Sequence, residues 1–83
     1  MNKVLLVGRL TKDTEIKTTP SGTDVTRFTV AVDRVKGQGE KDTDFIQCVA
    51  FNKTAQTINK YIHKGDQIIV EGNIKTGSYE DKD

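Results

Sequence analysis

Apolar and polar residues alternate along most of the chain, and this pattern predicts extended strands. The alternation is clearest in four segments, residues 3–10, 24–33, 44–51 and 66–75. Residues 24–33 are also rich in β-branched side chains, which favour strands. Gly8, inside the first segment, indicates a bend or the close approach of another backbone. The pattern therefore predicts four strands, with a turn at residues 19–22 before the second.

The two faces of residues 44–51 differ in kind. One face carries small apolar side chains that suit a barrel interior, Ile46, Cys48 and Ala50. The other face carries two aromatic rings with a polar amide between them, in the series Phe45, Gln47, Val49 and Phe51. Rings spaced among polar groups are what a stacking surface for unpaired nucleotide bases requires. Rings that cover a helix or a partner subunit would give the same pattern, so this strand leaves both interpretations open.

Residues 3–10 are apolar on both faces, because Leu5 and Val7 stand opposite Leu6 and Leu10. A strand with two apolar faces is expected where the second face meets another subunit rather than water. This segment therefore favours an oligomer.

Between the strands, two segments break the alternation. Residues 34–43 are polar and contain two glycines, so we expect a long, charged hairpin loop there. Residues 53–63 repeat apolar side chains at helical spacing and predict one short amphipathic helix, with Asn52 as its N-cap. Tyr61 is expected to pack rather than bind. In residues 66–75, the expected inward side chains are Ile68, Val70, Gly72 and Ile74.

The predicted order is three strands, a helix and a further strand. This is the layout of the oligonucleotide-binding (OB) fold, an all-β, five-stranded Greek-key barrel with one helix. We expect a single OB-fold domain over residues 1–83, incomplete at its C-terminus because the last barrel strand is missing from this chain. Such an opening would leave an unpaired seam between the third and fourth strands.

The composition narrows the function without identifying it. Thirteen Lys and Arg residues against twelve Asp and Glu residues give a net charge of +1, so bound phosphates would require the basic side chains to gather on one surface. No apolar run approaches the ~20 residues that span a bilayer, and no leader segment precedes the first strand. The single cysteine, Cys48, cannot form an internal disulfide. These features predict a cytoplasmic protein with no membrane association.

The sequence shows no motif for catalysis, metal binding or cofactor binding. His63 is the only histidine and has no second ligand at metal-binding spacing. No nucleophile with a partnered base is apparent, and Gly37 and Gly39 do not continue into a dinucleotide-binding motif, because Asp42 occupies the third glycine position. We expect a protein that is not an enzyme, with no metal and no cofactor.

A series of segments in order closely resembles the bacterial and phage single-stranded DNA-binding protein (SSB) family. It consists of residues 2–10, Asp13, residues 15–16, 19–22, 28–32, 44–51, 64–65 and 70–76, and it covers almost the whole chain. The resemblance implies an OB domain that assembles as a homotetramer. It also implies binding of single-stranded DNA without sequence preference, in replication, recombination and repair.

The resemblance also implies site residues. Bases would stack on Phe45, Phe51 and Tyr79. Basic side chains would contact the phosphates, namely Arg34, Lys36, Lys53, Lys64 and Lys75. Lys36 stands near the place where the family often has a ring, so one stacking contact is lost or replaced by a phosphate contact. The family's acidic tail is not found in this sequence, so partners recruited through that tail are not expected.

The sequence leaves open an alternative to the DNA-binding function. The chain could be an OB-fold module of the primosome type, which contacts other proteins and has weak affinity for DNA. The near-neutral charge and the missing loop ring favour it slightly.

Overall fold

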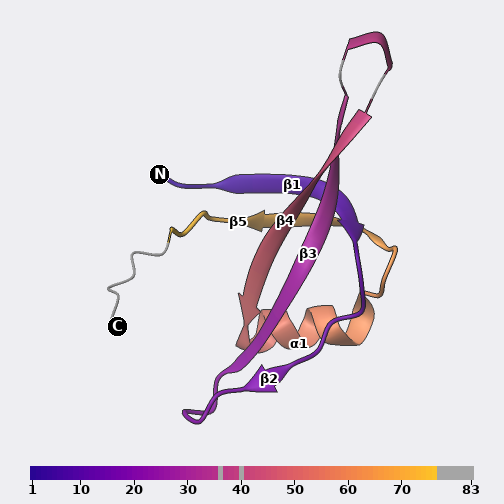
Figure 1. Cartoon of the computed structure of the whole chain (residues 1–83). Coiled ribbons are helices and arrows are strands. Elements are labelled where there is room, and N and C mark those ends of the chain that lie inside the picture. The colour runs from indigo at the N-terminus through magenta and orange to yellow at the C-terminus, as the bar shows by residue number, and fades with distance from the viewer. Residues whose placement is uncertain (36, 40, 77–83) are drawn as a thin grey trace, which may run out of the picture.

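A computed structural model describes residues 1–35, 37–39 and 41–76 (Figure 1). In chain order, the elements are β1 (Val4–Leu10), β2 (Lys17–Thr18), β3 (Asp24–Val35), the 3-10 turn η1 (Gly37–Gly39), β4 (Lys41–Phe51), α1 (Asn52–Tyr61) and β5 (Gln67–Gly72). The strands form one five-stranded antiparallel sheet, in which β2 is a short addition to the four predicted strands. The prediction of an all-β OB-type fold with one helix is confirmed.

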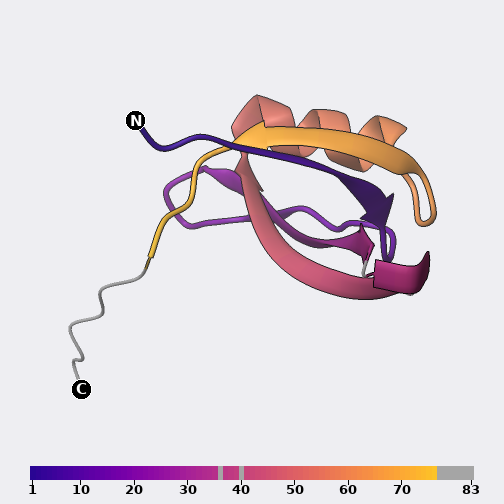
Figure 2. The same cartoon turned by 90° about the horizontal axis from the view of Figure 1, so that it is seen from above.

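The long strand β3 organises the sheet. It pairs with β4 from Val25↔Phe51 to Val35↔Lys41, and its other edge pairs with β1 and β2. Strand β1 continues to β5 from Val4↔Gly72 to Arg9↔Gln67. Seen from above, β1 and β5 run side by side while β4 curves around opposite them (Figure 2). Strands β4 and β5 do not pair with each other in the part of the chain that the structure describes, so the curved sheet is not closed into a barrel.

The core lies between the concave face of the sheet and α1. Its buried side chains come from four elements, and they are Leu10, Phe28, Val30, Ala50 and Ala55. Thr26 is also buried and satisfies its hydroxyl by donating a hydrogen bond to the carbonyl oxygen of Glu15 at 2.8 Å. Burial alternates along β4, with Phe45, Gln47, Val49 and Phe51 on the outer face. The predicted division of this strand into two faces is therefore confirmed.

Gly8 lies where the backbone of β1 comes close to β3. A Cβ atom at this position would collide with the carbonyl oxygen of Ala31 and would lie 2.8 Å from Cγ1 of Val30. The close backbone approach expected at this glycine is confirmed.

The loop predicted over residues 34–43 is wrong at both ends. Strands β3 and β4 continue to Val35 and Lys41 and form a two-stranded arm that projects beyond the sheet (Figure 1). Polar pairs across the arm stabilise it, including Thr43 Oγ1, which donates to Asp33 Oδ1 at 3.0 Å. The arm lies beyond the core, so it has no face that requires apolar side chains and no apolar alternation by which the sequence could reveal it.

The predicted start of the helix is also wrong. Asn52 is not an N-cap, because the capping position is Phe51 and no side chain caps the helix. Asn52 instead adopts a left-handed φ of 52°, which asparagine tolerates better than most residues. Its Oδ1 accepts a hydrogen bond from the backbone N of Asp24 at 3.2 Å, which ties the turn to β3.

Three further expectations are corrected. The helix ends at Tyr61 rather than His63, and the Tyr61 side chain is exposed rather than packed, with Lys60 Nζ 5.3 Å from its ring centroid. Strand β5 ends at Gly72, so Ile74 lies beyond the sheet and is exposed rather than inward.

Candidate nucleic-acid interface

Two phenyl rings stand on the outer face of β4. The side chains of Phe45 and Phe51 are 66% and 52% exposed, although rings of this size usually lie in a core. Because side chains alternate along a strand and the rings are six positions apart, both rings lie on one face about 20 Å apart along β4. The rings do not cover α1, which packs on the opposite face of the sheet against the core.

The surface between the rings is polar and includes a cation. Gln47 and Val49 lie between the rings on β4, and their partners across the ladder on β3 are Thr29 and Arg27. Arg27 is exposed and has no ion-pair or hydrogen-bond partner within residues 1–35, 37–39 and 41–76.

Sequence reasoning missed Arg27 as a site residue. Alternation along residues 24–33 puts Arg27 and Thr29 on one face, but only the register Arg27↔Val49 places Arg27 between the two rings.

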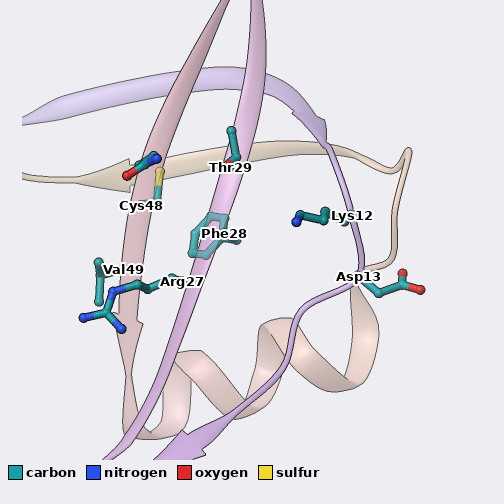
Figure 3. A pocket seen from close by; sticks show the side chains of 8 residues that line it. Lys12, Asp13, Arg27, Phe28, Thr29, Cys48 and Val49 are labelled. Atoms are coloured by element: carbon teal, nitrogen blue, oxygen red, sulfur yellow. The ribbon is translucent and has the colours of Figure 1, made fainter.

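A shallow hollow of about 270 Å³ lies at this place (Figure 3). Its lining comes from β3, β4 and the segment after β1, and comprises Lys12, Asp13, Arg27, Phe28, Thr29, Gln47, Cys48 and Val49. In Figure 3 the amine end of Lys12 points toward β3, whereas the carboxylate of Asp13 points away from it. The lining therefore combines two cations, Lys12 and Arg27, with hydrogen-bonding groups and with the inward-facing Phe28 and Cys48.

The basic residues predicted from the resemblance do not gather in one patch. Lys53 lies in the first turn of α1, two residues after Phe51, and is exposed. Lys64 lies in the segment between α1 and β5, where its backbone N donates a hydrogen bond to Asp13 Oδ1 at 2.8 Å.

Lys75 and Arg34 are placed differently. Lys75 follows β5 near the start of β1, where the neighbouring Ile74 N donates to Asn2 Oδ1 at 2.9 Å. The Arg34 guanidinium lies on the arm and pairs with the carboxylates of Asp42 and Asp44. The other two predicted contacts, Lys36 and Tyr79, lie outside the described residues.

Two titratable groups depart from their ordinary behaviour. Hydrogen bonds from the side chains of Gln56 and Thr18 lower the pKa of Asp24. Partial burial raises the pKa of the Cys48 thiol and makes it less reactive.

No three His, Cys, Asp or Glu side chains in residues 1–35, 37–39 and 41–76 are placed to hold a metal ion. The helix found in those same ranges is too short and too polar to cross a membrane.

Comparison with known proteins agrees with this arrangement. The model of the single-strand binding protein family matches residues 1–83. The "Single-stranded DNA-binding protein" of Clostridium perfringens (strain 13 / Type A) is 59% identical over 85 residues, which cover 100% of this chain and 55% of the relative. "Single-stranded DNA-binding protein 1" of Staphylococcus aureus (strain COL) is 47% identical over 85 residues, with 51% of the relative covered.

The chain spans about half the length of these curated relatives. None of the names describes an enzymatic activity. With a match along its whole length and the strand and helix order of an OB fold, the chain belongs to the single-strand binding protein family.

Proposed function

We propose that this chain binds single-stranded DNA without sequence preference, and that it does so without catalysis. The observation that carries the proposal is the pair of exposed rings on one face of β4, Phe45 and Phe51. Every base has a face that can stack on a ring, so stacking tolerates any sequence. The names of the relatives support the same ligand.

The mechanism has two parts. Basic side chains attract the phosphate backbone, and the bases then stack on the rings, which keeps them unpaired. By resemblance, Tyr79 is the third stacking residue, and the phosphate contacts are Arg34, Lys36, Lys53, Lys64 and Lys75. Holding DNA in this state serves replication, recombination and repair, and we propose that the protein acts in the cytoplasm.

Fluorescence polarisation of a labelled oligo(dT) tests the proposal. We expect saturable binding that weakens as salt increases, because phosphate contacts release counterions. Unlabelled single strands of any sequence should compete, and a duplex of the same length should compete poorly. No binding at low salt would overturn the proposal and favour the OB-fold protein-contact module, for which no specific structural observation speaks.

We also propose that the chain works as a homo-oligomer, and that a tetramer is its state by resemblance. The outer face of β1 and β5 supports this, because Leu5, Val7 and Ile69 are 66%, 48% and 71% exposed and Val7 pairs directly with Ile69. Light scattering should give a multiple of 9.2 kDa. Val7→Asp should lower that mass, because the charge would be desolvated in the contact. A monomeric wild type would contradict the oligomer.

We infer that residues 1–83 act as one OB-fold domain. What supports this is a single core cluster, to which β1, β3, β4, β5 and α1 all contribute side chains.

A further inference from the structure

The two rings are too far apart to hold neighbouring bases in a continuous stack. About 20 Å of strand separates them, whereas stacked bases in one DNA strand follow each other at about 3.4 Å. A strand that stacks on both Phe45 and Phe51 therefore carries intervening nucleotides across the middle of the sheet. Those nucleotides bring phosphates, and each phosphate carries a negative charge.

Part of the lining of the hollow lies on the stretch of sheet between the two rings. The lining includes two neighbouring pairs of the β3–β4 ladder, Arg27↔Val49 and Thr29↔Gln47, which belong to the face that carries the rings. The inward-facing Phe28 and Cys48 also line it. The side chains of Arg27 and Val49 extend toward the same side of the sheet (Figure 3). A strand that follows β4 from one ring to the other therefore passes over these two pairs.

The charges at the hollow favour an anion. Arg27 has no acidic partner in the described part of the chain, and the amine end of Lys12 points toward β3. The one carboxylate in the lining, that of Asp13, points away and accepts the backbone N–H of Lys64 at 2.8 Å. Thr29 and Gln47 add groups that can donate hydrogen bonds.

We propose that this hollow is a phosphate subsite for the nucleotides between the two rings. The planar guanidinium of Arg27 binds one phosphodiester of the single strand with two parallel hydrogen bonds, and Lys12 supplies a second, weaker contact. This inference rests on the proposed function and deepens it, because it assigns the path of the backbone between Phe45 and Phe51. Neither the resemblance nor the names of the relatives assign a role to Arg27.

The test compares charge-removing variants by oligo(dT) binding over a range of salt concentrations. Each phosphate neutralised on a single strand contributes about 0.7 to the slope of log K against log salt. Arg27→Gln should reduce that slope by about 0.7 and weaken binding at low salt by roughly tenfold. The double variant with Lys12→Gln should reduce the slope further, by up to about twice that amount.

Lys60→Gln is the matched control. It removes the same charge from an exposed position on α1, which packs on the opposite face of the sheet. Its salt slope and affinity should stay at the wild-type values. Circular dichroism should show that Arg27→Gln remains folded, as expected for an exposed side chain.

The variant Arg27→Lys distinguishes a phosphate contact by Arg27 from stacking of Arg27 on a base. Lysine keeps the charge, so a phosphate contact should retain the wild-type slope and most of the affinity. If both Arg27→Lys and Arg27→Gln weaken binding and neither changes the slope, Arg27 stacks on a base and the phosphate subsite is overturned. If wild type binds but Arg27→Gln behaves like Lys60→Gln, the subsite is overturned while the proposed function stands. If wild type binds no oligonucleotide, both fail together.

Discussion

Nε of Arg34 lies 2.9 Å from Oδ2 of Asp44, across the ladder of the β3–β4 arm. A second carboxylate, that of Asp42, lies 3.8 Å from Nη2 of the same guanidinium. A side chain expected to contact phosphate is therefore already paired with acidic groups. Because all three side chains are well exposed, these pairs contribute only about 0–1 kcal/mol each, and a phosphate can compete for the arginine.

Asp44→Asn should therefore strengthen DNA binding. The change frees the Arg34 guanidinium and removes a negative charge from the residue next to Phe45. We expect up to about a fivefold lower Kd for oligo(dT) at low salt, the equivalent of about 1 kcal/mol. Asp33→Asn is the control, because it removes the same charge from the arm without a contact to Arg34. The gain should disappear in the double variant Asp44→Asn/Arg34→Gln, and an equal gain from Asp33→Asn would show that only net charge matters.

Removing either ring should weaken DNA binding and leave the fold intact. Phe45→Ala and Phe51→Ala should each cost on the order of 1–3 kcal/mol of binding free energy, with an unchanged salt slope because no charge is lost. Their free energies of unfolding should change little, since both rings are exposed. Phe28→Ala provides the contrast, because that ring is buried and its removal should cost about 3–5 kcal/mol of stability. Normal affinity in both ring variants would contradict the stacking surface.

Gly8→Ala should destabilise the sheet. The added methyl group would meet the Ala31 carbonyl oxygen and would lie 2.8 Å from Val30 Cγ1, so β1 would have to move away from β3. Overpacking of this kind costs about 1–3 kcal/mol. Gly72→Ala is a matched control in β5, where an added Cβ meets nothing within 4 Å. Urea unfolding of the two variants should give clearly different midpoints, and equal midpoints would rule out the close contact.

The sequence predicted the fold where one face of a strand is buried. Alternation in residues 44–51 separated Cys48 and Ala50 from the two exposed rings, and the structure has the same division. Alternation did not predict the strands of the arm around Arg34 and Asp44, because neither face of the arm packs on the core and neither requires apolar residues. Alternation also predicted an inward side chain at Ile74. It cannot show where a strand ends, and β5 ends at Gly72.

The candidate site was harder to predict than the fold for a geometric reason. The rings of Phe45 and Phe51 lie on one strand, so spacing alone puts them on one face. Arg27 belongs to a different strand, and its place between the rings depends on the register of β3 against β4. A sequence without known pairing leaves that register open, and a slip of one residue would turn Arg27 to the opposite face.

Asp24 should make stability depend on pH in acid solution. Its Oδ2 accepts a hydrogen bond from Gln56 Nε2 at 2.7 Å and its Oδ1 accepts one from Thr18 Oγ1 at 2.7 Å. These bonds favour the ionised carboxylate and lower the pKa of Asp24 in the folded chain below its usual value of 3.8. A lowered pKa adds stability that is fully present above pH about 4 and is lost as pH falls through the folded-state value.

Urea unfolding of wild type and Asp24→Asn between pH 2 and 7 measures this contribution. The advantage of wild type should be constant from pH 7 down to about 4 and should shrink in more acid solution. Gln56→Ala, which removes the principal donor on an exposed helix position, should reduce the same acid-dependent part of the stability. Because protonation removes the preference for these donors, the Gln56→Ala and wild-type curves should converge at the acid end. A wild-type advantage that grows below pH 4 would contradict the lowered pKa.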